Sequence, residues 1–235
     1  MKKAERYFSN RAELCYAQDG SRCSLFTSLV SSFPALEELD LFYCPYITSQ
    51  GLVTIADSCP KLQCVTIQHV PTLSEESLCY LIEKGEGRIR HLDIDGELID
   101  DETMGMLGKL ATSLLKLSIF GSQELGPVGW EAICRLENLK QLELIDIHRI
   151  HQQPADKRQT LPQLPQMKQL VSLKVERGCH LRDKDLLALC SLCPNLEDLS
   201  LLCCHKITDD GLTNLFKSCK LKCLDTLIII GKNSR

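Results

Sequence analysis

The chain has 235 residues, of which 44% are hydrophobic and 25% charged, so it is long enough to bury a sizeable core. A formal net charge of −4 gives no sign of a nucleic-acid partner. No apolar run reaches the roughly 20 residues that a membrane span needs. We therefore expect neither a nucleic-acid nor a membrane partner.

The 14 cysteines are an unusually high number. In a secreted protein they would form a disulfide framework, whereas in a reducing compartment they would be buried thiols, metal ligands or catalytic groups. The basic start of the chain, residues 1–6, is not followed by an apolar stretch and does not resemble a secretory signal. We therefore favour the reducing compartment and expect a cytoplasmic or nuclear protein.

The first segment of the chain carries little pattern. Residues 1–20 show no strand repeat around Leu14, so we expect a tail or a partial N-terminal cap there. Residues 21–231 are periodic and form a single predicted domain, and residues 232–235 form a short C-terminal tail. Within the domain the strand pattern L-x-x-L-x-L occurs about eight times, at intervals of 25 to 31 residues. The copies begin at Leu36, Leu62, Ile89, Leu114, Leu139, Leu170, Leu196 and Leu224.

A second pattern keeps step with the first. About 11 or 12 residues after most strand starts comes a cap residue, followed by apolar side chains three or four residues apart. Each unit is thus a strand, a turn and a helix, and it can bury its apolar face only against its neighbours. The expected helical pairs are Leu52 with Ile55, Leu78 with Leu81, Met104 with Leu107, Trp130 with Ile133, Leu186 with Leu189, and Leu212 with Leu215.

Two places depart from this regularity. The longest interval, after Leu139, contains prolines and polar residues that oppose a regular helix. We expect an irregular loop near residues 148–160, which either binds a partner or is a tolerated insertion. At the other end, no helix follows the apolar strand of residues 227–230, so either its edge is poorly shielded or a longer form continues.

The repeat resembles the cysteine-containing subtype of leucine-rich repeat, which reads C-x-x-L-x-x-L-x-L-x-x-C-x-x-I-T-D-x-G-L-x-x-L-x-x-x-C. Residues 193–219 match it almost position by position, and residues 36–59 match it well. The subtype is typical of F-box/leucine-rich-repeat proteins, the substrate receptors of SCF-type ubiquitin ligases, and of relatives without the F-box. The resemblance implies an α/β solenoid, or horseshoe, with a parallel sheet on its concave face and helices on its convex face. Because residues 1–35 contain no F-box pattern, contact with ligase components would require a longer form that carries one.

The clustered cysteines first suggest a metal or redox site. Cys190 and Cys193 form a C-x-x-C pair, and Cys203, Cys204 and Cys219 follow closely. A structural zinc ion needs four converging ligands. The repeat subtype explains most of these positions more simply, because it places small apolar thiols between successive coils. We therefore expect no metal and no cofactor.

The six histidines give no catalytic motif. A histidine base would need a cysteine or serine brought close to it, and His69 and His91 lie on strands where such an approach across the sheet is feasible. The chain contains no G-x-S-x-G, Gly-rich phosphate loop or H-E-x-x-H motif. We expect no enzymatic activity, and a thiol- or zinc-dependent enzyme is the least favoured alternative.

The expected concave face carries the strongest functional signal. Strand side chains alternate between the two faces, so the third, fifth, seventh and eighth positions of each repeat form one surface. These positions hold eight acidic and three basic residues, a net charge of −5 against −4 for the whole chain. Aromatic side chains at the same positions favour a protein interface. The candidate partner-binding residues are Glu38, Asp40, Phe42, Tyr43, His69, His91, Asp93, Asp95, Lys116, Phe120, Glu143, Asp146, Lys174, Glu176, Arg177 and Asp198.

We predict a protein-interaction module whose partner carries a basic segment. By resemblance, it recognises substrates for an SCF-type ubiquitin ligase, and the alternative is a standalone leucine-rich-repeat scaffold or inhibitor unrelated to ubiquitination. A simpler explanation of the acidic residues is that they only keep the sheet soluble. If the face binds, reversal of Asp93 and Asp95 to lysine should weaken binding and leave the thermal midpoint almost unchanged.

Overall fold

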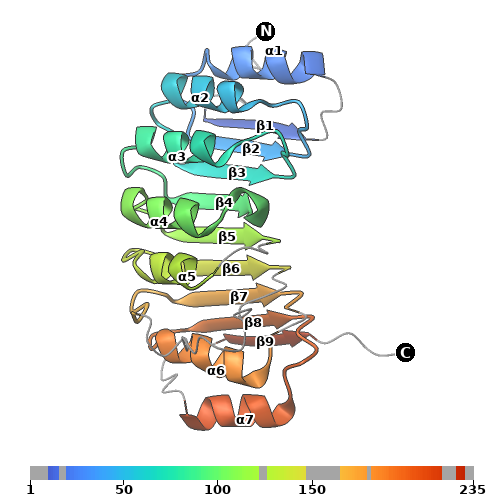
Figure 1. Ribbon diagram of the computed structural model, residues 1–235, viewed down its shortest axis with the longest axis vertical. Helices are drawn as coiled ribbons and strands as arrows, with labels where there is room; N and C mark the ends of the chain where they lie inside the picture. Colours follow the sequence, from blue (N-terminus) through green and yellow to red (C-terminus); the bar gives the residue numbers. More distant parts are fainter. Residues whose placement is uncertain are drawn as a thin grey trace, which may run out of the picture.

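The protein is a stack of strand-and-helix coils. The computed structural model describes residues 10–15, 20–121, 126–146, 165–178, 181–218 and 226–230. In these residues, nine parallel strands form one sheet in strict chain order (Figure 1). The strands are β1 (Arg11–Cys15), β2 (Glu38–Phe42), β3 (Cys64–Gln68), β4 (His91–Asp95), β5 (Lys116–Phe120), β6 (Gln141–Ile145), β7 (Ser172–Glu176), β8 (Asp198–Leu202) and β9 (Thr226–Ile230).

The helices stack beside one another along one face of this sheet (Figure 1). No helix in the described residues is long and apolar enough to cross a membrane. The predicted loop at residues 148–160 lies outside the described residues. The helices are α1 (Gly20–Val30), α2 (Ser49–Ser58), α3 (Glu75–Lys84), α4 (Asp101–Leu110), α5 (Pro127–Cys134), α6 (Asp183–Leu192) and α7 (Asp209–Ser218), with a short 3-10 helix, η1 (Gly96–Leu98), after β4.

The core lies between the sheet and the helices. Neighbouring strands pair residue for residue, so Leu39 lies beside Val65 and Val65 lies beside Leu92, all at most 2% exposed. From the helical side, residues such as Leu52 and Met104 are fully buried against these rows. The expected α/β leucine-rich-repeat solenoid is confirmed.

In four coils the start of a helix is bonded to the start of the next helix along the stack. Thr48, Ser74 and Asp100 precede α2, α3 and α4, and their side chains accept hydrogen bonds from N–H groups of the first turn. In four coils the first helical residue then bonds to the start of the next helix. These contacts join Ser49 to Ser74 (2.9 Å), Glu75 to Thr103 (3.2 Å), Asp101 to Gly126 (2.8 Å) and Asp183 to Thr208 (2.8 Å).

The repeat cysteines act as small buried thiols. Cys44 and Cys204 follow β2 and β8, and the thiol of each lies near a carbonyl oxygen of the preceding coil, Leu14 at 3.1 Å and Val175 at 3.7 Å. Eight of the ten cysteine side chains that the structure describes are buried. Their role is to pack between coils, as the repeat subtype predicts.

The sequence pattern did not predict the first strand. Residues 1–20 were expected to be a tail or partial cap with about eight strands following, but Arg11–Cys15 forms β1, in register with β2. Ala12 and Leu14 lie opposite Leu39 and Leu41 and take their place in the core rows. The strand was missed because alanine replaces a leucine and the first leucine of the pattern is absent.

Candidate functional site

The face of the sheet that the described helices leave uncovered is the candidate site, and we call it the concave face. Parallel sheets usually have both faces covered by helices. Here the outward residues of successive strands form parallel rows, for example Asp40, Thr66 and Asp93, followed by Ser118 and Glu143. The fold therefore places side chains from distant parts of the sequence on one polar surface.

Ion pairs neutralise much of the acidic charge on this face. Arg11 of β1 reaches Asp40 at 2.6 Å, and its guanidinium also lies 3.8 Å from Glu38. Lys116 contacts Glu143 at 2.7 Å. On β7 Lys174 contacts Glu176 at 3.1 Å, and Arg177 lies 4.0 Å from Asp146. Because these pairs are solvent-exposed, each contributes at most about 1 kcal/mol to stability, but each cancels local charge.

The negative charge that remains gathers around β4. No lysine or arginine of the described residues lies within ion-pair distance of Asp93, Asp95 or Glu97. Asp93 instead accepts a hydrogen bond from Gln68 at 2.8 Å. Burial raises the pKa of Asp93 and of Asp95, and the hydrogen bonds from Gln68 and from the His69 backbone oppose that rise only in part. The centre of the acidic surface is therefore β4.

The residue after most strands turns the chain with a positive φ. Tyr43, His69 and Asp146 have φ of 52°, 55° and 56°. At Tyr43 and Asp146 the N–H then donates to the last carbonyl of the next strand, at 2.9 and 2.8 Å. Such a backbone is uncommon for residues other than glycine, and it holds these side chains along one rim of the sheet.

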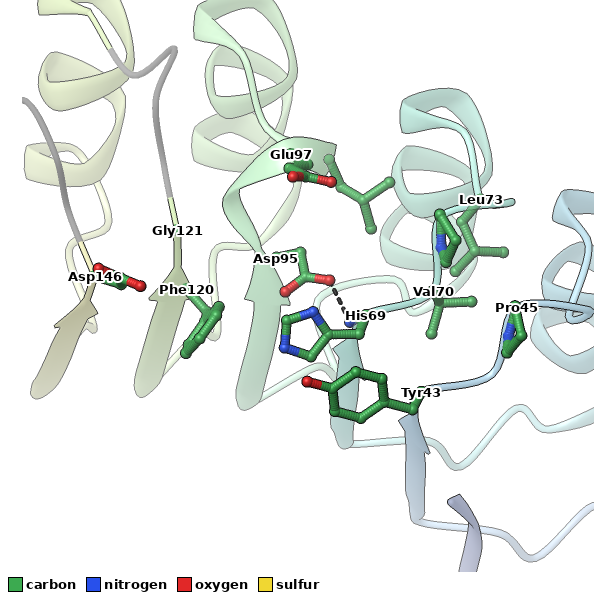
Figure 2. Close-up of a pocket in the computed structure, with 12 residues that line it drawn as sticks. Tyr43, Pro45, His69, Val70, Leu73, Asp95, Glu97, Phe120, Gly121 and Asp146 are labelled. Carbon is green, nitrogen blue, oxygen red and sulfur yellow. Dashed lines mark hydrogen bonds between the residues drawn. The ribbon is translucent and has the colours of Figure 1, made fainter. Parts of the chain in front are cut away.

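The rim is interrupted after β4, where the chain turns directly into η1. The His69 N–H therefore donates to a carboxylate oxygen of Asp95, and this bond replaces the usual backbone bond (Figure 2). Asp95 as a whole is only 8% exposed. Lysine at position 95 would remove this cap and bury a cation, so the structure leads us to expect that reversal of Asp95 lowers the thermal midpoint.

A pocket of about 570 Å³ opens at the interruption, and we call it the rim pocket. Its size is within the range of roughly 300–1,000 Å³ typical of ligand sites. Figure 2 shows Tyr43, His69, Asp95 and Phe120 following one another across the strand ends. The lining residues are Tyr43, Pro45, His69, Val70, Pro71, Leu73, Asp95, Glu97, Leu98, Phe120, Gly121 and Asp146.

Aromatic rings form one side of the rim pocket. The Tyr43 ring stacks on the His69 ring at 4.3 Å, and Phe120 meets His69 edge-on at 5.2 Å. Phe42 lies against Tyr43 at 4.7 Å between ring centroids. The Arg177 guanidinium lies 5.4 Å from the centroid of the Phe120 ring. These contacts hold the rings in place and join residues that follow or end β2, β3, β5 and β7.

A thiol and an imidazole also meet on the concave face. Cys64 Sγ lies 3.4 Å from His91 Nδ1, an approach across the sheet that the sequence allowed. A nucleophilic cysteine needs a lowered pKa. Burial, and then the negative charges of Glu38 and Asp40, raise the pKa of Cys64. In the described residues no group of three metal-binding side chains converges. The pair therefore has the geometry but not the electrostatics of a catalytic dyad.

The predicted binding residues all lie on the concave face or its rim, but they fall into different groups. Tyr43, His69, Asp95, Phe120 and Asp146 share the rim pocket, whereas exposed Asp198 lies on β8, far along the stack. Sequence reasoning missed Arg11 because β1 was missed, and Glu97 because the strand pattern has ended there. The 27-residue spacing from Leu14 to Leu41 was the signal that could have found β1.

Comparisons with known proteins agree with the repeat assignment. Residues 34–56 and 192–216 match a family model described as Leucine Rich repeat. These segments contain the β2–α2 and β8–α7 coils. The fold is a leucine-rich-repeat solenoid, and these two coils match the family model of the repeat.

A structural comparison gives a more distant likeness. The chain is similar to one in the crystal structure of the Rad7 and Elc1 complex in yeast, with 20% identity and a TM-score of 0.45. The match covers 88% of this chain and 63% of that chain. Comparison with curated proteins gave no match.

Proposed function

We propose that this chain is a protein-recognition module that binds its partner on the concave face. The observation that carries the proposal is the uncovered face of the sheet, where ion-paired side chains surround rigid aromatic rings. Aromatic side chains held in place by their neighbours are typical interface anchors. Rows of side chains across many stacked strands suit an extended partner surface.

We further propose that the partner is a substrate for ubiquitination. This part rests on the resemblance of residues 36–59 and 193–219 to the repeat subtype of F-box/leucine-rich-repeat receptors. The alternative is a scaffold or inhibitor that acts without ubiquitin-pathway components. The raised pKa of Cys64 supports a binding role over a thiol enzyme.

Affinity purification with mass spectrometry tests the binding proposal. The concave variant carries Glu38→Lys, Asp93→Lys and Asp198→Lys. The matched control carries Glu83→Lys, Glu102→Lys and Asp210→Lys, the same charge change at exposed positions on α3, α4 and α7. Circular dichroism should first show that both variants are folded.

The expected result is a protein that co-purifies with the wild type and the control but is depleted from the concave variant. Cullin-RING components among the retained proteins would favour the ligase link, and their absence alongside a stable partner would favour the scaffold. Equal loss of partners from both variants would refute the concave face as the binding surface.

A further inference from the structure

Two of the carboxylates in the rim pocket have no lysine or arginine partner among the described residues. Asp95 and Glu97 line it, and neither has a lysine or arginine of the described residues within ion-pair distance. Asp146 lines it too and lies 4.0 Å from Arg177. Asp95 is buried, and buried charge is costly unless it is paired, so its place in the pocket favours a cationic ligand.

Asp95 provides an independent indication. Asp95 as a whole is 8% exposed, and one of its carboxylate oxygens accepts the His69 N–H. The other oxygen, Oδ1, accepts no hydrogen bond from the described residues. Figure 2 shows this carboxylate beside the His69 ring, on the side toward Glu97, at the strand ends that line the pocket. Oδ1 is not one of the fully buried unpartnered atoms of the described residues, so a donor from outside the chain can reach it.

The rings beside these carboxylates suit a planar cation. Tyr43 and His69 stack within the pocket lining, and Phe120 lies next to His69. Phe120 already accepts a guanidinium, that of Arg177, near its ring. Guanidinium groups stack on aromatic rings and bond to carboxylates through two parallel N–H groups. Both halves of this recognition pattern are present in one pocket.

We propose that the rim pocket receives an arginine side chain from an extended segment of the partner protein, with the guanidinium bonded to Asp95 and Glu97 beside the aromatic rings. This inference rests on the proposed protein-binding function and names the chemistry of its partner. An acidic ligand would be repelled, and an apolar side chain would leave Asp95 Oδ1 unpaired. Lysine can pair with a carboxylate, but it lacks the planar fork and the stacking surface of arginine.

Nuclear magnetic resonance titration of the intact chain tests the proposal without knowledge of the partner. The probe is N-acetyl-arginine methylamide, and the matched control is N-acetyl-citrulline methylamide, which has nearly the same shape but no charge. We expect saturable shifts from the arginine compound, confined to residues such as Tyr43, His69 and Phe120, at millimolar concentration. The citrulline compound should bind at least about fivefold more weakly, because loss of about 1 kcal/mol of charged hydrogen bonding corresponds to that factor.

Two variants examine the carboxylates. Glu97→Gln removes an exposed charge of η1, and Asp95→Asn keeps an acceptor for the His69 N–H while removing the charge. Each variant should bind the arginine compound about threefold more weakly or worse, whereas Glu102→Gln on the helical side should bind it as the wild type does. Three results would each overturn the assignment: equal binding of the arginine and citrulline compounds, shifts outside the pocket, or tighter binding of the corresponding lysine compound.

The test separates this inference from the proposed function. If the arginine compound does not bind but the concave variant still loses its partner, the module function stands and only the arginine assignment fails. If the arginine compound binds but partner capture is unaffected by the concave variant, the pocket is real and the proposed binding surface is wrong.

Discussion

Asp101→Ala should destabilise the solenoid more than its partly exposed position suggests. Asp101 is the first residue of α4, and its Oδ1 accepts the N–H groups of both Gly126 and Gly129, each at 2.8 Å. α5 begins at a glycine cap that has no side chain to accept these donors. An N-cap acceptor contributes about 0.5–2 kcal/mol, and a hydrogen bond to a charged group about 1.5–3 kcal/mol. Because Asp101 is partly solvated, we expect a loss of about 2–3 kcal/mol.

The matched control is Glu102→Ala, one residue further along α4. Glu102 is exposed and also lies in the first turn, so its removal loses a similar interaction with the helix dipole, about 0.3–1 kcal/mol, without uncapping α5. Urea unfolding measures the difference, and thermal unfolding should show the Asp101→Ala midpoint lower by roughly 4–10 °C. If the two variants lose the same free energy, the contact between coils does not stabilise α5 and our account of the stacking is wrong.

Three further outcomes follow from single contacts. Burial raises the pKa of Asp93, so the folded protein holds a proton at pH values where the unfolded chain has lost it. The contribution of Asp93 to stability therefore falls as the pH rises above the unfolded pKa of about 3.9. Asp93→Asn should therefore be at least as stable as the wild type at pH 7, with a difference that shrinks toward pH 4; a less stable variant at pH 7 would contradict this. Gly211→Ala should lower the free energy of unfolding in urea by about 1–3 kcal/mol, because the new Cβ would meet the Asp183 carboxylate that bonds to the start of α7. An unchanged midpoint would show that Asp183 can move away freely. Burial raises the pKa of Cys59 to about 11 and that of Cys134 to about 12. At pH 8 neither thiol should therefore react with a maleimide until guanidinium unfolds the chain. Labelling of these two cysteines in the folded protein at the rate of a free thiol would refute their burial.

The repeat periodicity was predictable because it follows from local rules. A strand of alternating leucines and a capped helix with an apolar stripe are each visible within about 26 residues, and every expected helical pair lies on an observed helix. The same logic failed at β1, where the pattern is too short to be recognised without its pairing to β2. There, Ala12 is identified as a core residue only by its position opposite Leu39.

The candidate site was predictable as a list of residues but not as an electrostatic surface. Counting charges gave only a net charge of −5 for the face, because a sequence does not show which side chains meet. The fold brings Arg11 to Asp40 and Lys116 to Glu143, residues 29 and 27 positions apart. It places no lysine or arginine of the described residues within ion-pair distance of Asp93, which is bonded to Gln68 instead. Asp95 changes most, from an exposed binding acid to a buried cap of His69 that also lines the rim pocket.

The sequence by itself determined the strand-and-helix repeat, its period, the side chains of the core and the role of the buried cysteines. Each of these depends on interactions within one coil or on the regular recurrence of the same positions in successive coils. The tertiary structure decided where charge remains and where the rim opens. Both depend on contacts between neighbouring strands and on the single turn after β4, where η1 begins and the carboxylate of Asp95 takes the place of a backbone carbonyl.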